Sequence, residues 1–162
     1  DLHSFPTRRS SDLHIALEAG RIDARLLELE VTERMLTRAG GAVDTLRELR
    51  ALGVRVLVDE FGSGYFSLSE LRDLPVDAVK MPRRFVSQID SDPRARSICA
   101  ASIAIARAFG LTAVAVGIET QKQRELLYAD GCAEGQGFLF APPQPLEQVL
   151  RTLRAADLRA ST

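Results

Sequence analysis

Two neighbouring carboxylates end an apolar stretch of this sequence. Asp59 and Glu60 follow the aliphatic residues Val54, Val56, Leu57 and Val58, and Gly62 and Gly64 come shortly after them. A strand that buries aliphatic side chains does not normally end in two acids unless these meet a positive group. The glycines let the backbone turn sharply or approach a ligand closely. Segment 58–65 therefore indicates a metal or phosphate site at the end of a parallel strand.

Other polar side chains lie near the ends of further apolar stretches. They are Glu30, Glu33, Lys80 and Glu119, and Gln136 stands beside the start of the last such stretch. In a β/α barrel all strands point the same way, so these side chains would converge on the rim that carries the active site. Carboxylates suit Mg²⁺ or Mn²⁺, and two such ions about 4 Å apart can activate a water and hold a phosphodiester. A nearby lysine would offset an anionic substrate or position the attacking water.

Each of these residues also has an ordinary structural explanation when it is taken alone. Residues 30–33 could be a solvated strand end, and residues 59–60 could be polar loop residues. Lys80 could extend to solvent, and Glu119 could cap a following helix. Their joint placement at successive strand ends is what favours a shared site.

The elements that must position these residues alternate regularly from residue 14. The expected strands are 26–31, 54–58, 76–81, 112–116 and 137–140. The expected helices are 14–19, 42–52, 68–71, a longer one that includes 98–109, then 121–130 and 146–153. This alternation predicts a parallel sheet covered by helices, closed as an open doubly wound sheet or as a β/α barrel. Phosphate-loop and dinucleotide fingerprints are absent, which counts mildly against the nucleotide-binding open sheets.

Composition excludes some classes of protein. The 162 residues are 46% apolar, enough for one domain with a core, and 21 basic against 22 acidic residues give a net charge of −1. That balance argues against a nucleic-acid-binding module. No apolar run approaches the roughly 20 residues of a membrane span, and no signal peptide is readable, so a cytoplasmic location is expected. Cys99 and Cys132 are expected to be buried, unreactive thiols.

Several segments, in their order and spacing, resemble the EAL domain, a bacterial family that hydrolyses cyclic di-GMP. They are LELEVTE at 27–33, VDEFGSGYFSL at 58–68, LPVDAVK at 74–80, FV at 85–86, AVGIET at 115–120 and GCAEGQGFLF at 131–140. The resemblance covers about residues 14 to 155. It implies a β/α barrel with one reversed strand, and an Mg²⁺- or Mn²⁺-dependent reaction that opens the cyclic dinucleotide to linear pGpG.

The resemblance also implies a role for each matching residue. The implied metal ligands are Glu30, Asp59 and Glu60. The implied catalytic residues are Lys80 and Glu119. The implied substrate-binding or supporting residues are Glu33, Gly62, Gly64 and Gln136.

The chain departs from the family pattern at several of these places. Glu60 stands where the family has a second aspartate, and its extra methylene moves the carboxylate by about 1 Å, enough to damage the geometry. Pro82 and Val116 stand where the family has acidic residues, so neither can bind metal or accept a proton. The signature Glu-Ala-Leu strand and the metal-binding asparagine of the next strand are absent, and both would lie before residue 14. We therefore expect hydrolysis to be weak or lost.

The expected architecture is an α/β fold, a partial TIM-like barrel that lacks its first strands, because a complete barrel takes about 250 residues. Residues 1–13 have no helical or strand period and are expected to be a disordered or foreign leader, residues 14–155 the partial domain, and 156–162 a tail. The open edge at 26–31 predicts a marginal or self-associating segment, or a fragment of a longer protein. Expected partners are cyclic di-GMP, a second copy, or a sensor or cyclase domain. A non-catalytic module that binds the dinucleotide or a protein, and a non-functional gene fragment, are the alternatives.

Overall fold

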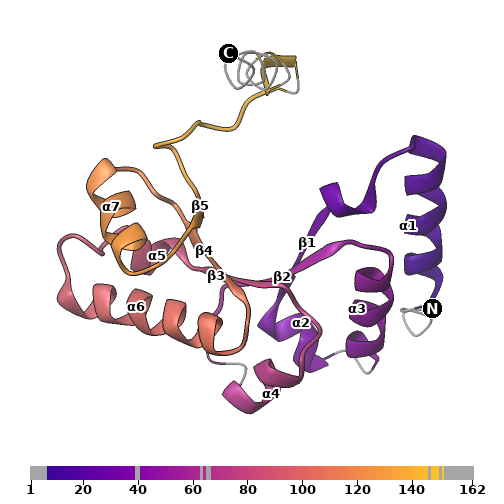
Figure 1. Cartoon of the computed structure of the whole chain (residues 1–162), viewed down its shortest axis with the longest axis horizontal. Coiled ribbons are helices and arrows are strands. Elements are labelled where there is room, and N and C mark those ends of the chain that lie inside the picture. Colours follow the sequence, from indigo (N-terminus) through magenta and orange to yellow (C-terminus); the bar gives the residue numbers. More distant parts are fainter. Residues whose placement is uncertain are drawn as a thin grey trace.

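The computed structural model describes residues 7–38, 41–62, 64, 67–145, 147–149 and 151. Within them the chain forms a five-stranded sheet in which every neighbouring pair is parallel and the strands follow sequence order (Figure 1). The strands are β1 Glu28–Thr32, β2 Arg55–Asp59, β3 Ala78–Met81, β4 Thr112–Val116 and β5 Glu134–Gln136. The predicted parallel sheet is confirmed.

Helices connect successive strands, as parallel pairing requires. The connecting helices are α2 Glu33–Arg38, α3 Ala42–Ala51, α4 Leu68–Asp73, α5 Arg83–Val86, α6 Pro93–Ala108 and α7 Gln121–Ala129. Helix α1 Thr7–Gly20 and the 3₁₀ turn η1 Ala24–Leu26 precede β1. Figure 1 shows α3, α4 and α6 on one side of the sheet, while the other side is open. No helix in this part of the chain is long and apolar enough to cross a membrane.

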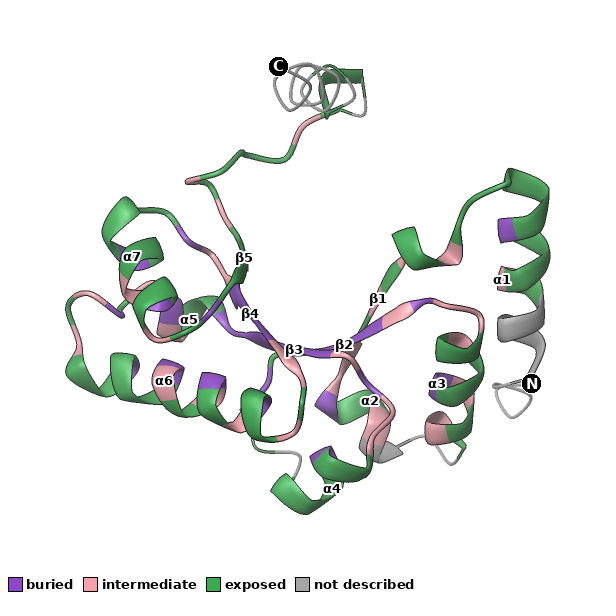
Figure 2. Ribbon diagram, viewed as in Figure 1, coloured by how far each residue is buried: buried purple, intermediate pink, exposed green. Residues whose placement is uncertain are grey.

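The core lies between the sheet and its helices. Successive strand side chains point to opposite faces, and Val56, Val58 and Val79 belong to the buried cluster that also takes in Leu46 of α3 and Ile103 of α6. Figure 2 shows this buried material along the middle strands. The opposite face has only a small apolar cluster in the described structure, made of Leu57, Ala78 and Val114. Most of the apolar burial therefore lies on one face, and the other is left for polar side chains.

A charged cluster shows that the sheet is curled. Arg55 of β2 binds Glu28 of β1 with an N–O distance of 2.5 Å and Glu134 of β5 at 2.9 Å. Two strands separate β2 from β5, and in a flat sheet they would lie about 14 Å apart. Side chains of β2 and β5 can meet only if the sheet bends toward its open face, which is the curvature of a barrel wall.

Most element boundaries are shifted by one or two residues from the sequence prediction, and two differences are larger. The fifth strand was predicted at 137–140, but it is Glu134–Gln136. The prediction is wrong because the carbonyl of Gln136 accepts hydrogen bonds from the N–H groups of Gly117 and Ile118, and the chain then turns so that the Phe140 N–H donates to the Gly137 carbonyl. Helix α1 begins at Thr7, inside the range 1–13 that was expected to be a leader.

The remaining predicted segments fall partly outside the description. Residues 1–6 of the expected leader and the expected tail 156–162 lie outside the described residues. Of the helix predicted at 146–153, residues 147–149 and 151 are described and are helical. Short helices α2 and α5 were not predicted.

Candidate functional site at the carboxyl ends of the strands

The sheet register places the predicted polar residues on one face. Residues paired across parallel strands share a face, and every second residue along a strand returns to it. The pairs that fix this face are Thr32–Asp59, Glu30–Leu57, Leu57–Ala78, Lys80–Val114 and Val116–Gln136. Glu30, Asp59, Lys80, Val116 and Gln136 consequently all lie on the concave face. For Glu30, Asp59 and Lys80 this is the shared face expected from the sequence. Gln136 reaches it because β5 ends at Gln136 and does not begin after it, as predicted.

Lys80 and Glu30 contact each other across the intervening strand. The Lys80 ammonium donates to Glu30 Oε1 at 2.5 Å, although β1 and β3 are not neighbours. The Lys80 side chain is 4% exposed, and that of Glu30 is 46% exposed. The low exposure shows that Lys80 does not extend to solvent. Its charge is neutralised by Glu30 on the concave face.

The carboxylates of Asp59 and Glu33 accept hydrogen bonds from the backbone of the loop after β2. Asp59 Oδ1 accepts the N–H of Glu60 at 2.8 Å, and Glu60 has a left-handed backbone with φ +53° and an exposed side chain. Glu33 is buried, and its Oε1 accepts the N–H of Gly62 at 2.8 Å. Gly62 also has a positive φ, +86°, so a glycine is needed for this turn. Glu33 supports the loop rather than lying open at the rim.

The rest of this loop is described only in part. Gly64 has a φ of +95° and open space where a Cβ would lie. The motif residues Ser63, Tyr65 and Phe66 lie outside the described residues.

Glu119 is paired with an arginine that the sequence analysis did not single out. Arg83, the first residue of α5, donates a hydrogen bond to Glu119 Oε1. Helix α7 is instead capped by Thr120, whose side chain accepts the N–H of Gln123 while the Gln123 side chain accepts the N–H of Thr120. Glu119 is thus free of a capping role. A basic residue two positions after the third strand was the only sequence signal for Arg83.

A cavity of about 380 Å³ opens beside this pair. Its lining residues are Arg83, Val116, Gly117, Glu119, Gln136, Gly137, Phe138, Ala141, Pro142 and Pro143. The cavity thus brings Glu119 and Gln136 together at the carboxyl ends of β4 and β5. Val116 gives its wall an apolar side chain. Pro82 is buried and immediately precedes α5. That both replace acids of the family stays a prediction from the sequence.

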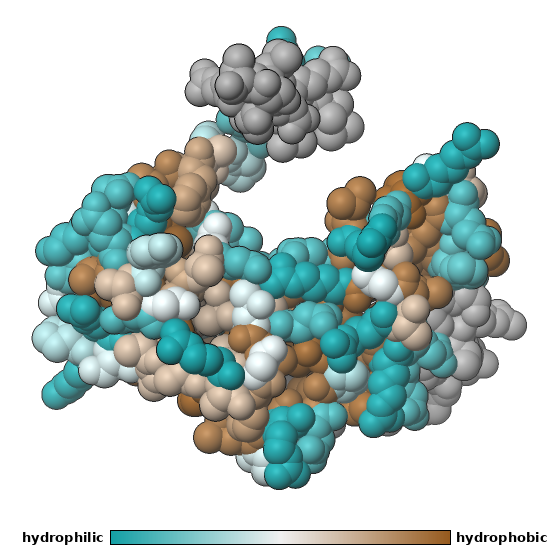
Figure 3. Space-filling view, in the orientation of Figure 1, coloured by the Kyte–Doolittle hydropathy of each residue, from teal (hydrophilic) through white to brown (hydrophobic). Residues whose placement is uncertain are grey.

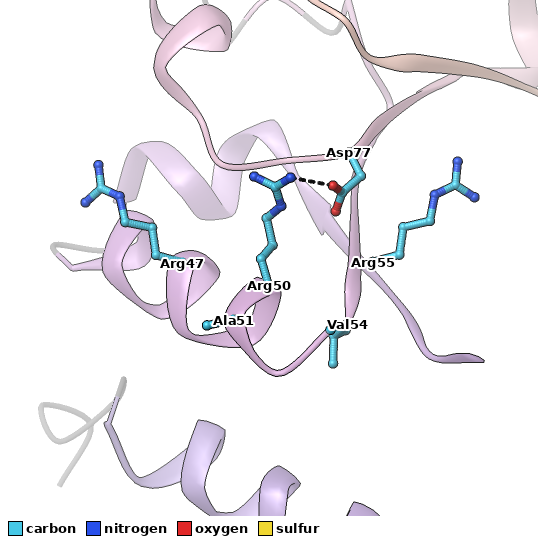
Figure 4. Close-up of a pocket in the computed structure, with 7 residues that line it drawn as sticks. Arg47, Arg50, Ala51, Val54, Arg55 and Asp77 are labelled. Atoms are coloured by element: carbon cyan, nitrogen blue, oxygen red, sulfur yellow. Dashed lines mark hydrogen bonds and ion pairs between the residues drawn. The ribbon is translucent and has the colours of Figure 1, made fainter. Parts of the chain in front are cut away.

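A larger cavity, of about 520 Å³, lies at the opposite ends of the strands. Arg47, Arg50, Arg55 and Asp77 line it (Figure 4). Its charges are already paired: Arg50 binds Asp77 Oδ1 at 2.7 Å, and Asp77 Oδ2 accepts the N–H of Val56 at 2.9 Å. This cavity is separate from the predicted rim.

The described residues do not fit a two-metal centre. No three Asp, Glu, His or Cys side chains among them are grouped so that they could hold a metal ion. Glu30 is bonded to Lys80 and Glu119 to Arg83, while Val116 offers no donor atom. The arrangement can position polar groups around a ligand, but the side chains described here do not by themselves form the oxygen cage that a divalent ion requires.

Comparison with known proteins places this geometry in a family. The family model of the EAL domain matches residues 9–143. A cyclic di-GMP phosphodiesterase of Pseudomonas aeruginosa is 44% identical over 134 residues, which are 82% of this chain and 23% of that protein. The chain therefore spans less than a quarter of that relative.

Solved structures agree with the sequence comparison. The "PaMucR Phosphodiesterase, c-di-GMP complex" superposes with a TM-score of 0.80 at 37% identity, covering 86% of this chain and 57% of that one. A manganese/cy-diGMP complex of Klebsiella pneumoniae BlrP1 superposes with a TM-score of 0.74 at 30% identity, covering 82% of this chain and 34% of that one. The curled parallel sheet is thus part of a TIM-barrel-like fold, and the chain belongs to the EAL domain family.

Proposed function

We propose that this chain is an EAL-domain segment of cyclic di-GMP signalling in which hydrolysis of the cyclic dinucleotide is weak or lost. The observation that carries the proposal is the rim position of Val116. It shares the register of Gln136 and lines the cavity beside Glu119, yet its side chain can neither bind metal nor accept a proton. Pro82 removes a second acid at the adjacent strand end. Each lost group lowers the rate by orders of magnitude where metal and water placement dominate it.

The test is a turnover assay of the full chain with cyclic di-GMP and Mn²⁺ or Mg²⁺. We expect no pGpG above the background without protein. A catalytically competent EAL-domain phosphodiesterase in parallel shows that the assay works. Production of pGpG by this chain at a rate similar to that of the competent phosphodiesterase, and lost in the Asp59→Ala variant, would overturn the proposal.

The substituted positions allow a sharper version of this test. The double variant Val116→Glu with Pro82→Asp restores both acids, and we expect it to exceed the wild-type rate. The matched control is Val116→Gln with Pro82→Asn, which has nearly the same shape without the charges. Equal rates for the two double variants would show that these positions do not limit hydrolysis.

A second candidate is a module that binds the dinucleotide without cutting it. The cavity beside Glu119 favours it, because Phe138 is 64% exposed at its edge and Gln136 and Arg83 offer hydrogen-bonding groups. An aromatic face next to such groups suits a planar base. Stacking of one base on an aromatic side chain is worth about 1–3 kcal/mol.

Calorimetry with cyclic di-GMP in the absence of metal separates the two candidates. For a binding module we expect measurable affinity that falls at least about fivefold in Phe138→Ala. Phe140→Ala is the control, since Phe140 is similarly exposed but does not line the cavity. Equal losses in both variants would exclude base stacking in this cavity.

A further inference from the structure

We infer that Arg83 is a built-in counter-ion for Glu119, and that this protein cation stands on the β4 side of the rim in place of a divalent metal ion. The inference deepens the proposed loss of hydrolysis, on which it rests, by naming a residue that opposes metal binding. It is tested without any turnover, so that its failure can be told from failure of the proposed function.

The two partners come from neighbouring strand ends. Pro82 is the single residue between the end of β3 and Arg83, which begins α5. Glu119 lies shortly after the end of β4. Pro82 has a φ of −62° and is buried at the start of α5. Its ring restricts the backbone there, so the point from which the Arg83 side chain departs is fixed. The arginine then reaches Glu119 across the carboxyl end of the β3–β4 pair.

The bare backbone of Gly117 makes room for the arginine. A Cβ added to Gly117 would lie 2.4 Å from Arg83 Cγ and 2.9 Å from Cδ, well inside contact distance. The aliphatic part of Arg83 therefore lies directly on the Gly117 backbone, which directs the guanidinium to Glu119. Gly117 also has a φ of +84°, a conformation that suits glycine.

The charges on the rim follow from these contacts. An arginine stays protonated at all physiological pH values, so Glu119 has a permanent positive neighbour. A divalent ion placed at Glu119 would have to displace that cation or be repelled by it. On the other side of the rim, Lys80 is already bonded to Glu30 in the same way.

The size of the effect is set by solvent exposure. The Arg83 side chain is 63% exposed and that of Glu119 is 40% exposed. Exposed pairs of this kind are worth up to about 1 kcal/mol, which is about fivefold in an equilibrium constant. The counter-ion should therefore weaken metal binding measurably without abolishing it.

The experiment measures Mn²⁺ binding to the full chain by the electron paramagnetic resonance of free Mn²⁺. The variants are Val116→Glu, Val116→Glu with Arg83→Gln, and Val116→Glu with Arg84→Gln. Arg84 is the matched control: it is the next residue of α5, and its guanidinium lies 4.6 Å from the centre of the Phe85 ring. Removing either arginine changes the net charge equally, so only the local contact differs.

We expect weak Mn²⁺ binding in the wild type and a gain in Val116→Glu. Adding Arg83→Gln should tighten binding by about fivefold more, while adding Arg84→Gln should change it by less than about twofold, because the more distant charge is screened by salt. Equal affinities in the two double variants would overturn the inference. So would micromolar Mn²⁺ binding by the wild type that is lost in Glu119→Gln. Far-UV circular dichroism checks folding, and Val116→Asp provides a second background if the glutamate variant unfolds.

Discussion

Lys80 shows how a single residue joins the fold to the candidate site. Its ammonium is nearly inaccessible to solvent, and it bonds Glu30 on a strand that is not its neighbour. Removing such a charge from water is unfavourable unless a partner compensates. The contact between Lys80 and Glu30 therefore stabilises the concave face as well as defining the rim.

The first prediction concerns Glu30→Gln. The variant keeps the side-chain shape but leaves the buried ammonium facing a neutral amide. Because Glu30 is half exposed, we expect a loss of about 1–2 kcal/mol in the free energy of unfolding, below the value for a fully buried pair. Urea unfolding followed by circular dichroism measures it. Asp44→Asn, which removes the acid from an exposed pair with Arg47, should change stability by less than about 0.5 kcal/mol, and equal losses would contradict the prediction.

The second residue-scale prediction concerns the thiols. Burial raises the pKa of Cys99 to about 11, with smaller contributions from Cys132 and Asp130, and burial also raises the pKa of Cys132. The thiolate is the reactive form, and at pH 8 a group with a pKa of 11 is roughly one part in a thousand thiolate. A thiol reagent should therefore label neither cysteine rapidly until urea unfolds the chain. Rapid labelling of both in the native protein would show that these thiols are not buried.

At the scale of elements, a strand and a helix are each followed by a glycine, and the surroundings of the two glycines differ. Gly117 follows β4 and Gly110 follows α6, and both have left-handed backbones, with φ of +84° and +69°. A Cβ at Gly117 would meet Arg83, whereas one at Gly110 would meet nothing within 4 Å. The pair thus separates backbone strain from side-chain contact.

We expect Gly117→Ala to destabilise the chain more than Gly110→Ala does. The strain of a left-handed alanine, about 1 kcal/mol, is common to both variants. Displacing the stem of Arg83 adds about 1–2 kcal/mol at position 117, as overpacking usually does. Urea unfolding of the two variants side by side gives the difference, and identical midpoints would show that Arg83 moves away freely.

The elements also show how far sequence reasoning reached. Strand β4 could be predicted at its observed bounds because 112–116 is a continuous apolar run between Gly110 and Gly117. Strand β5 has the sequence Glu-Gly-Gln and is exposed, so it has no apolar signal, and its pairing with β4 is a tertiary effect. Helices α2 and α5 have six and four residues, too few for a helical period to be visible.

The candidate site was predictable to a similar extent. Glu30, Asp59 and Lys80 could be placed on one rim from strand order and alternation alone. Gln136 could not, because it ends β5, whereas the predicted fifth strand began after it. Arg83 could not, because its role depends on how the bare backbone of Gly117 directs its side chain. The metal roles given to Glu30, Asp59 and Glu60 stay predictions.

At the scale of the whole molecule, the sheet is open at β1 and β5 within the described residues, and apolar side chains lie at both of these edges. Leu26 is 80% exposed beside β1, and Phe138 follows β5. Figure 3 shows apolar surface on both sides of the hollow that the curled sheet encloses. Self-association through these edges stays a prediction. If the prediction is wrong, size-exclusion chromatography with light scattering will show a monomer at all protein concentrations.

The guanidinium of Arg55 binds a carboxylate on each edge strand, Glu28 of β1 and Glu134 of β5. Burial acts to lower the pKa of Arg55, but hydrogen bonds to Glu134 and Glu28 outweigh it and hold that pKa above its ordinary value. The Arg55 side chain is only 27% exposed, so its two carboxylate contacts are less screened than surface pairs. Arg55 is therefore placed to keep the sheet curled.

The last prediction tests this with Arg55→Met, which keeps an apolar stem but leaves Glu28 and Glu134 facing each other without a cation. We expect a loss of about 1–3 kcal/mol in the free energy of unfolding. Relative to the wild type, hydrogen exchange should speed up more for the β1 and β5 amides than for those in β3. Arg50→Met is the control, because Arg50 lines the same cavity (Figure 4) and its bond to Asp77 reaches neither β1 nor β5. That variant should leave exchange in β5 unchanged. If the β5 amides exchange at the same rate in both variants, the curvature of the sheet is held by packing of the helices on its convex face and not by the arginine.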